Sequence, residues 1–386
     1  MNVPVGSRLG TPGVWSAAAV VAIADRPWAA PPVLAAADCP LVLPDRWIWD
    51  LWPVQTLAGG VATVAGGELW MALAAPVMAN PIDRHAVARL WLLHHSGGDW
   101  HDLGPVLPVG HSPGSREWSG SATLDGDRLV LHFTAAGRRG EAVPTFEQRL
   151  FMTETRLPAA AICCPIGWSP PIETVRSDGA IYDRARETTG AVGTIKAFRD
   201  PAWFRDPADN TEYLLFTASL AASSSAFNGT IGVARRLGSA WQLLPPLITA
   251  DGVNNELERP HIVISGNYYY LFWSTQASVF APGIEAPTGL YGMVTDRLAG
   301  PWTPINGTGL VIGNPAEAPH QAYSWLVLND LRVVSFIDRC PNFIGQPAPE
   351  FKLQLVGDIV TLAPLASHLV KPQSPRTGTS ARLDHG

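Results

Sequence analysis

Glycine and proline constrain the fold of this chain more than any other feature. The 386 residues include 36 glycines and 35 prolines. Both residue types interrupt regular structure, so the elements between them must be short. After the N-terminal region almost no stretch shows a helical period, whereas runs rich in β-branched and aromatic residues alternate with turn residues. The sequence therefore predicts an all-β protein and argues against alternating β and α units.

The clearest hairpin runs from Ile262 to Gln276 and turns at Gly266-Asn267. Buried β-branched and aromatic residues on both sides of such a turn are typical of paired strands. The other strand candidates are residues 69–73, 88–95, 128–134, 145–155, 212–220, 229–235, 289–294, 332–338 and 351–362.

A weak internal repeat groups these strands. Trp100, Trp241 and Trp302 each stand shortly before an apolar run. Their spacings fit one or two units of roughly 60 to 70 residues, the size of a propeller blade with its loops. Five such units would use the chain. Three unrelated edge strands that each start with a tryptophan would give the same pattern.

The N-terminal region has two interpretations. Thr11 as N-cap, with Pro12 at the first helical position and an alanine-rich run behind it, predicts a helix over residues 11–24. Alternatively, the apolar run from Val14 to Ala24 is a signal-peptide core. We favour the helix, and we expect a secreted or periplasmic protein even though no clear signal peptide is present. The run is too short to span a bilayer.

Charge and cysteine content exclude several classes of partner. The net charge of −6 offers no basic surface for phosphate backbones, so we expect no nucleic acid partner, and we expect no membrane partner. Neutral polar ligands fit better. Some of the 15 tryptophans could face a sugar, although core packing is the better explanation for most of them. The cysteines Cys39, Cys163, Cys164 and Cys340 lack metal-ligand spacing, and their disulfide state stays open.

Three carboxylates stand in aromatic or apolar surroundings. Asp50 lies between tryptophans, Asp200 belongs to the first of two Arg-Asp-Pro copies, and Glu258 lies in the stretch from Val253 to Val263 with Glu256 two residues before it. An extended strand would point Glu256 and Glu258 to one face. A carboxyl group beside apolar walls can hold a proton near neutral pH and donate it. The simpler alternatives are a turn aspartate at position 50 and a salt bridge at a strand end from Glu258 to Arg259 or to another cation.

Three other motifs are assigned no chemistry. Gly110 to Gly114 matches the G-x-S-x-G pattern of hydrolases, but Pro113 has no N–H to offer an oxyanion, so the segment is expected to be a turn. Asp206, in the second Arg-Asp-Pro copy, runs into a polar turn. The histidines His94, His95 and His101 lack a carboxylate or cysteine at ligand spacing and are expected at the surface.

Taken together, the acids and their neighbours resemble the levansucrase, inulosucrase and β-fructofuranosidase family of retaining glycoside hydrolases, glycoside hydrolase family 68. Six stretches match in the family's order between about residues 40 and 340. They are Ile48–Pro53 (Ile-Trp-Asp-Leu-Trp-Pro), Arg116–Ser121, Phe198–Pro201, Val253–His261, Gly300–Trp302 with Asn306–Val311, and Ala322–Ser324.

The resemblance implies a five-bladed β-propeller, which we expect to form one catalytic domain over residues 1–370. The tail at 371–386 is rich in Ser, Pro and Thr and is expected to be disordered. It implies Asp50 as nucleophile, Glu258 as general acid/base and Asp200 as transition-state stabiliser, with Arg199 keeping Asp200 ionised. The residues that look like those holding the sugar rings or flanking the reacting centre are Trp49, Trp118, Ser119, Arg199, Glu256, Arg259, Gln276 and Tyr323.

The implied activity is cleavage of sucrose with transfer of fructosyl to fructan, other sugars or water. Two alternatives remain, an invertase-like β-fructofuranosidase and a non-catalytic carbohydrate-binding propeller. Some members have an aspartate that helps hold calcium where this chain has Asn255, so we expect no cofactor. Gln276 stands where polymer-forming members often carry Arg or His, which makes long-chain synthesis a weaker expectation than sucrose cleavage.

Overall fold

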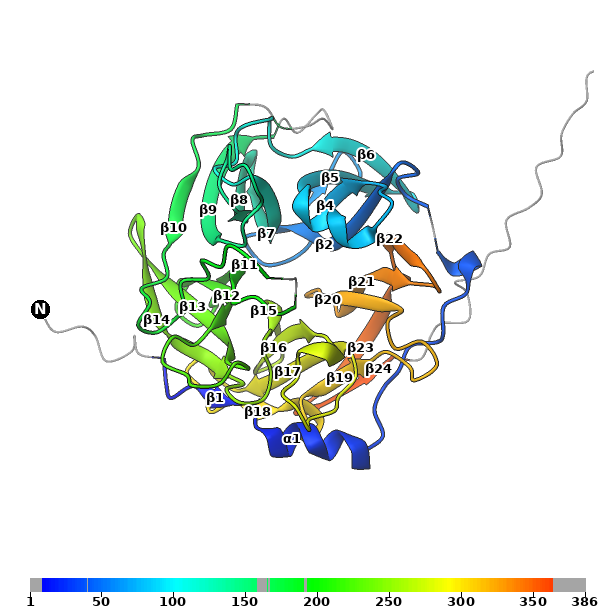
Figure 1. The fold of residues 1–386 in the computed structure, drawn as a ribbon, viewed down its shortest axis with the longest axis vertical. Helices are drawn as coiled ribbons and strands as arrows, with labels where there is room; N and C mark the ends of the chain where they lie inside the picture. The colour runs from blue at the N-terminus through cyan, green and yellow to red at the C-terminus, as the bar shows by residue number, and fades with distance from the viewer. Residues whose placement is uncertain (1–8, 40, 158–164, 166, 191–192, 364–386) are drawn as a thin grey trace, which may run out of the picture.

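Strands make up almost all of the regular structure. The computed structural model of the protein describes residues 9–39, 41–157, 165, 167–190 and 193–363. Within these residues the strands form four sheets, none of them closed on itself. Figure 1 shows the sheets standing around a common centre, with strands β2, β7, β11, β15 and β20 nearest to it. The all-β prediction is confirmed.

The largest sheet has nine strands in the order β10-β9-β8-β7-β2-β4-β5-β6, with β3 paired to β4. A short parallel pairing of β2 with β7, from Val54–Thr56 to Ala122–Leu124, joins its two antiparallel halves. Its strands are β2 (Arg46–Thr56), β3 (Thr63–Val64), β4 (Gly67–Pro76), β5 (Arg89–Ser96), β6 (Asp99–Pro105), β7 (Arg116–Asp125), β8 (Arg128–Ala136), β9 (Gln148–Arg156) and β10 (Ile172–Val175).

The other three sheets have five strands each, and each begins with the strand nearest the centre. The first contains β11 (Phe198–Arg205), β12 (Glu212–Ser219), β13 (Gly229–Leu237), β14 (Ala240–Thr249) and β1 (Gly13–Val14). The second contains β15 (Glu258–Ser265), β16 (Tyr268–Thr275), β17 (Gly289–Thr295), β18 (Thr303–Pro304) and β19 (Leu310–Gly313). The third contains β20 (Ala322–Val327), β21 (Arg332–Arg339), β22 (Phe343–Pro347), β23 (Phe351–Val356) and β24 (Ile359–Leu362).

Every predicted strand lies on one of these elements, and the hairpin at Gly266 is formed by β15 and β16. Gly266 has a φ of 58° there, a conformation that favours glycine. Trp100 and Trp241 lie near the start of β6 and β14, and Trp302 lies directly before β18. The tryptophan repeat therefore marks outer strands of three different units.

The predicted helix start is wrong. The helix α1 covers only Ala17–Val21, and Ser16, not Thr11, caps it by accepting a hydrogen bond from Ala19 N at 3.3 Å. The earlier residues Gly13 and Val14 instead pair with β14 as strand β1. Strand pairing outweighs the capping pattern because it satisfies backbone groups along an otherwise open sheet edge.

The remaining helical elements are short 3₁₀ turns. They are η2 (Ala22–Asp25), η3 (Ala36–Asp38), η4 (Pro81–Ala86), η5 (Ala277–Val279) and η6 (Ile305–Gly307). No helix among the described residues is long and apolar enough to cross a membrane. The predicted disordered tail at 371–386 and the cysteines Cys163 and Cys164 lie outside the described residues.

The N-terminal segment runs along the outside of the sheets (Figure 1). Trp15, which is fully buried, packs against Trp273 and Tyr291 with ring centroids 5.2 and 5.0 Å away. Ala29 then pairs with Ile312. We call residues 29–39 and 41–43 the N-terminal belt, because they pass the sheet that contains β20 before the chain enters β2.

The surface prediction for the histidines is wrong for His94. Its side chain is buried, and its Nε2 lies 2.9 Å from Val64 O. Strand β5 lies between β4 and β6 and is buried along most of its length, so a polar ring there needs a backbone partner. The Gly110–Gly114 segment is a turn, as expected, in which Ser112 Oγ accepts a hydrogen bond from Gly114 N.

Candidate active site

The strands nearest the centre share an irregularity at one level. Pairing with the neighbouring strand shifts register between Trp49 and Trp52 in β2, Trp118 and Gly120 in β7, Arg199 and Ala202 in β11, Glu258 and His261 in β15, and Tyr323 and Leu326 in β20. Such bulges redirect side chains that would otherwise follow the pleat. Four residues within them have positive φ: Asp50 (52°), Asp200 (59°), Arg259 (52°) and Ser324 (58°).

Positive φ is costly for a residue with a side chain, about 1–3 kcal/mol each, and persists only where neighbouring contacts fix it. Arg259 supplies such contacts. Its buried guanidinium donates to Ser324 O and Oγ at 2.9 and 2.7 Å and to Leu51 O at 2.7 Å. It thereby ties β15 to β20 and to β2. The alternative of a salt bridge at Glu258 is realised with another cation, since Glu258 pairs with Arg199 and not with Arg259.

A cavity of about 680 Å³ opens on the side where these strands begin. It collects almost all of the predicted site residues, from segments up to 274 positions apart. Those lining it are Trp49, Asp50, Trp118, Ser119, Arg199, Asp200, Glu258, Arg259, Gln276 and Tyr323. Glu256 alone does not line it, because it lies fully buried behind Arg199.

Arg199 connects the acids on two sheets. Its Nη2 donates to Glu256 Oε1 and to Glu258 Oε1, both at 2.8 Å, and its Nε lies 3.6 Å from Asp200 Oδ2. Burial by itself would lower the pKa of Arg199, but Glu256, Glu258 and Asp200 raise it well above its ordinary value. Arg199 is therefore a fixed positive charge beside three carboxyl groups.

The prediction that Glu256 and Glu258 share one strand face needs correction. Strand β15 begins at Glu258, and Glu256 precedes it. The two carboxyl groups still meet, because both accept a hydrogen bond from the same guanidinium nitrogen of Arg199.

Each of the other two acids has a hydroxyl donor from a neighbouring strand. Ser119 Oγ on β7 donates to Asp50 Oδ2 at 2.5 Å. Thr217 Oγ1 on β12 donates to Asp200 Oδ2 at 2.9 Å and accepts from Arg259 N at 3.1 Å.

Glu258 accepts a second hydrogen bond from the hydroxyl of Tyr323 on β20. Burial, and then the charge of Glu258, raise the pKa of Tyr323 well above its ordinary value, so it remains a donor.

Burial dominates the titration of Asp200. It raises the pKa of this carboxyl group to about 6, although Arg199 and the Thr217 hydroxyl act to lower it. The expectation that Arg199 keeps Asp200 ionised is therefore incomplete, since the effect of desolvation on the pKa outweighs that of the ion pair. Burial likewise raises the pKa of Glu256, against the opposing effect of Arg199.

The cavity rim carries residues that the sequence did not single out. Arg84, in η4, lies over the rings of Trp49 and Phe343, with its guanidinium carbon 5.3 and 4.3 Å from their centroids. Burial lowers the pKa of Arg84 to about 10. Burial also lowers the pKa of His85 well below its ordinary value, helped by Arg84, so the imidazole is neutral. Asp338, at the end of β21, lines the same rim and has a pKa raised by burial.

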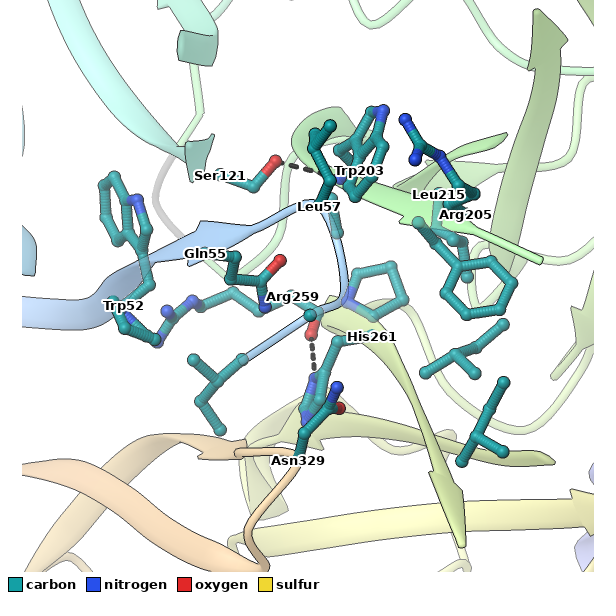
Figure 2. Close-up of a pocket in the computed structure, with 18 of the residues that line it drawn as sticks. Trp52, Gln55, Leu57, Ser121, Trp203, Arg205, Leu215, Arg259, His261 and Asn329 are labelled. Atoms are coloured by element: carbon teal, nitrogen blue, oxygen red, sulfur yellow. Dashed lines mark hydrogen bonds between the residues drawn. The ribbon is translucent and has the colours of Figure 1, made fainter. Parts of the chain in front are cut away.

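A second cavity of about 610 Å³ lies beyond the bulges (Figure 2). It shares only Asp200 and Arg259 with the first cavity, and later residues of β2, β11 and β15 line it. Figure 2 shows Trp52, Gln55, Trp203 and His261 around it. Asp50 and Glu258 do not line this second cavity; they line the first one.

The position that could suggest calcium is occupied by a lysine ammonium group. Lys196 Nζ donates to Asn255 Oδ1 at 3.2 Å, Asn228 Oδ1 at 2.7 Å and Ala226 O at 2.7 Å. Three oxygen atoms thus surround a side-chain cation, where a divalent ion would be repelled. Within the described residues, no group of three or more His, Cys, Asp or Glu side chains could hold a metal ion. These residues do not fit calcium.

Comparison with known proteins agrees with this geometry. A family model described as Levansucrase/Invertase matches residues 7–231 and 223–367, which is most of the chain. The chain belongs to glycoside hydrolase family 68. Among similar proteins, the levansucrase of Rahnella aquatilis is 30% identical over 400 residues, covering 90% of this chain and 93% of that protein.

Solved structures of this family share the fold. The inulosucrase from Halalkalicoccus jeotgali bound to kestose has a TM-score of 0.82 and 34% identity, covering 91% of this chain and 95% of that one. The levansucrase from Gluconacetobacter diazotrophicus has a TM-score of 0.81 and 23% identity, covering 92% and 90%. The predicted family membership is confirmed.

Proposed function

We propose that this family 68 enzyme is a retaining, sucrose-cleaving fructosyltransferase in which Asp50 is the nucleophile, Glu258 the general acid/base and Asp200 the transition-state stabiliser. One observation supports this assignment above the others. The three acids come from β2, β11 and β15, yet all line one cavity, and each accepts a hydrogen bond from a protein donor. The names of the relatives, levansucrase and inulosucrase, support the same assignment.

The chemistry requires two displacement steps. In the first, an Asp50 carboxylate oxygen attacks the anomeric carbon of the fructosyl unit while Glu258 protonates the glycosidic oxygen, and glucose leaves. In the second, Glu258 takes the proton of an acceptor hydroxyl, the acceptor oxygen attacks the same carbon, and the bond to Asp50 breaks. Ser119 Oγ, 2.5 Å from Asp50 Oδ2, orients the nucleophile.

Asp200 stabilises positive charge that develops on the fructosyl ring. This role needs the ionised form, so activity should fall as the pH drops through about 6. Glu256 acts as a positioning residue, because it lies behind Arg199 and fixes the guanidinium that faces Glu258. Trp49 and Trp118 offer aromatic faces to the sugar rings.

We also infer a five-bladed β-propeller that forms one catalytic unit. Five strands nearest the centre each carry a bulge, and the parallel β2–β7 pairing explains why a five-stranded unit (β2–β6) and a four-stranded unit (β7–β10) appear as one nine-stranded sheet. Gln276 lines the cavity as a neutral side chain, which favours short transfer products and some hydrolysis over long polymers.

We propose that no metal is needed, since Lys196 takes the place of a cation beside Asn255.

The sugar balance after incubation with concentrated sucrose tests this function. Transfer releases more free glucose than free fructose and yields oligofructosides, whereas an invertase releases the two sugars equally. Glu258→Gln and Asp50→Asn should each lower kcat by about 10³-fold or more. Asp206→Asn, in the second Arg-Asp-Pro copy, is the matched control: its carboxylate accepts from Ala208 N and Tyr269 OH outside the cavity. Wild-type cleavage by Glu258→Gln would overturn the acid assignment.

A further inference from the structure

The N-terminal belt is attached to the sheet containing β20 by two buried glutamines. Gln321 accepts from Leu34 N at 3.0 Å and donates to Pro32 O at 3.0 Å. Gln346 accepts from Val42 N at 2.8 Å and donates to Leu43 O at 3.2 Å. Because each side-chain amide satisfies a backbone donor and a backbone acceptor, these contacts fix the belt at both ends.

Two cysteines lie between these attachments, one on each partner. Cys39 Sγ donates to Ala35 O at 3.4 Å, and Cys340 Sγ, from the turn after β21, donates to Leu34 O at 3.2 Å. The two thiols thus bond to consecutive carbonyls of the belt. The two thiols also influence each other, because Cys340 contributes to raising the pKa of Cys39. Both are free thiols and only partly buried.

We propose that Cys39 and Cys340 form a disulfide that locks the belt to the rim of the active-site cavity. The oxidant is a small disulfide such as oxidised glutathione. One protein thiolate attacks it and releases one glutathione thiolate, and the second protein thiolate then attacks the mixed disulfide and releases the other. The protein loses two protons and two electrons, and one glutathione disulfide takes them up to become two glutathione thiols.

This bond reaches the active site through the residues that follow Cys340. Pro341, Asn342 and Phe343 line the cavity, and Phe343 packs under the guanidinium of Arg84. The rim loop is already braced, because Cys340 N donates to Asn342 O at 2.8 Å. A cross-link would therefore restrain this part of the cavity wall and join the first and last parts of the fold.

The reaction should be slow at neutral pH and faster in alkali. Burial and the neighbouring Cys340 raise the pKa of Cys39 to about 11, so few Cys39 side chains are thiolates at pH 7. Since the thiolate is the attacking form, the step that uses Cys39 should accelerate as the pH rises towards 11.

Peptide mapping of the full-length protein tests the proposal. After treatment with oxidised glutathione at pH 8.5, tryptic peptides 9–46 and 340–352 should appear as one linked species that dithiothreitol separates. The intact monomer should lose about 2 Da by mass. Its thermal midpoint should rise by about 5 °C. Cys39→Ser and Cys340→Ser, which keep a hydroxyl donor, should each abolish the linked species and the thermal shift.

The remaining cysteines serve as the control, since a Cys163→Ser, Cys164→Ser double variant should still form the 9–46 to 340–352 link. The proposal is overturned if native protein shows no such link under conditions that oxidise the unfolded chain. It is equally overturned if the link appears only between monomers, or if Cys39 and Cys340 are alkylated independently after oxidation.

Discussion

Replacement of Thr217 by valine should shift the pH dependence of catalysis. Thr217 Oγ1 donates to Asp200 Oδ2, and this hydrogen bond lowers the pKa of a carboxyl group that burial has raised to about 6. A hydrogen bond to a charged group contributes about 1.5–3 kcal/mol. At about 1.4 kcal/mol per pH unit, its loss raises the pKa of Asp200 by about one to two further units. The acidic limb of kcat/KM should therefore move from about pH 6 to about pH 7–8.

The expected loss of activity follows from the ionised fraction of Asp200. At pH 6 the kcat/KM of Thr217→Val should fall by about five- to fiftyfold, whereas above pH 9 most of the activity should return. The variant should also be less stable by about 1–3 kcal/mol, because Arg259 N loses the acceptor that Thr217 Oγ1 provides. Initial rates of glucose release between pH 4.5 and 9.5, with urea denaturation alongside, measure both effects.

Two further variants make this result decisive. Thr217→Ser keeps the hydroxyl and should restore the wild-type acidic limb. Thr134→Val removes an equally buried hydroxyl that contacts only backbone, donating to Ser119 O and accepting from Asp200 N, so it should lower stability without moving the limb. If folded Thr217→Val keeps the wild-type acidic limb, or if Thr134→Val shifts it equally, Asp200 is not the group that controls it.

Three other variants test neighbouring parts of the site. Arg199→Met should lower the free energy of unfolding by about 3–5 kcal/mol at pH 7, because it leaves Glu256 buried without its cation. The loss should be smaller at pH 5, where more of Glu256 is protonated. Equal losses in urea denaturation at the two pH values would contradict this account. Lys196→Met should lower the free energy of unfolding by about 2 kcal/mol, because Asn255 and its neighbours lose a hydrogen-bond donor. Wild-type protein should show the same thermal midpoint with calcium or with EDTA. A wild-type midpoint that falls in EDTA would contradict the metal-free assignment. Gln276→Arg should raise transfer over hydrolysis by about two- to fivefold, read as the ratio of free glucose to free fructose, and an unchanged ratio would remove this residue from the acceptor side.

Sequence patterns identified the strands and the acids because both depend on local residue choice. Alternating and β-branched runs marked every predicted strand, and aromatic neighbours marked Asp50 and Asp200. The donors to these acids were harder to find. Thr217 is one of several hydroxyl residues in apolar strands, and only the pairing of β12 with β11 brings it to Asp200. Nothing in its own neighbourhood distinguishes it.

Two of the wrong predictions, the helix start and the surface position of His94, have a common physical cause. A capping pattern at Thr11 and a histidine pair at His94 were judged by their immediate neighbours. The first segment pairs with β14 across more than 230 residues of sequence, and the second lies on an inner strand of its sheet. Long-range pairing decided both, and a local pattern carries no information about it.

The bulges explain why these acids meet where a regular sheet would keep them apart. A regular strand points successive side chains to opposite faces, so neighbouring residues such as Arg199 and Asp200 could not both face one cavity. Positive φ at Asp200 breaks that alternation, and both residues line the cavity. The same holds for Glu258 and Arg259 on β15. Because Arg259 in turn holds Ser324 and Leu51, the strain on each strand is balanced by hydrogen bonds to its neighbours. Each acid is therefore positioned by the sheets around it as well as by its own strand.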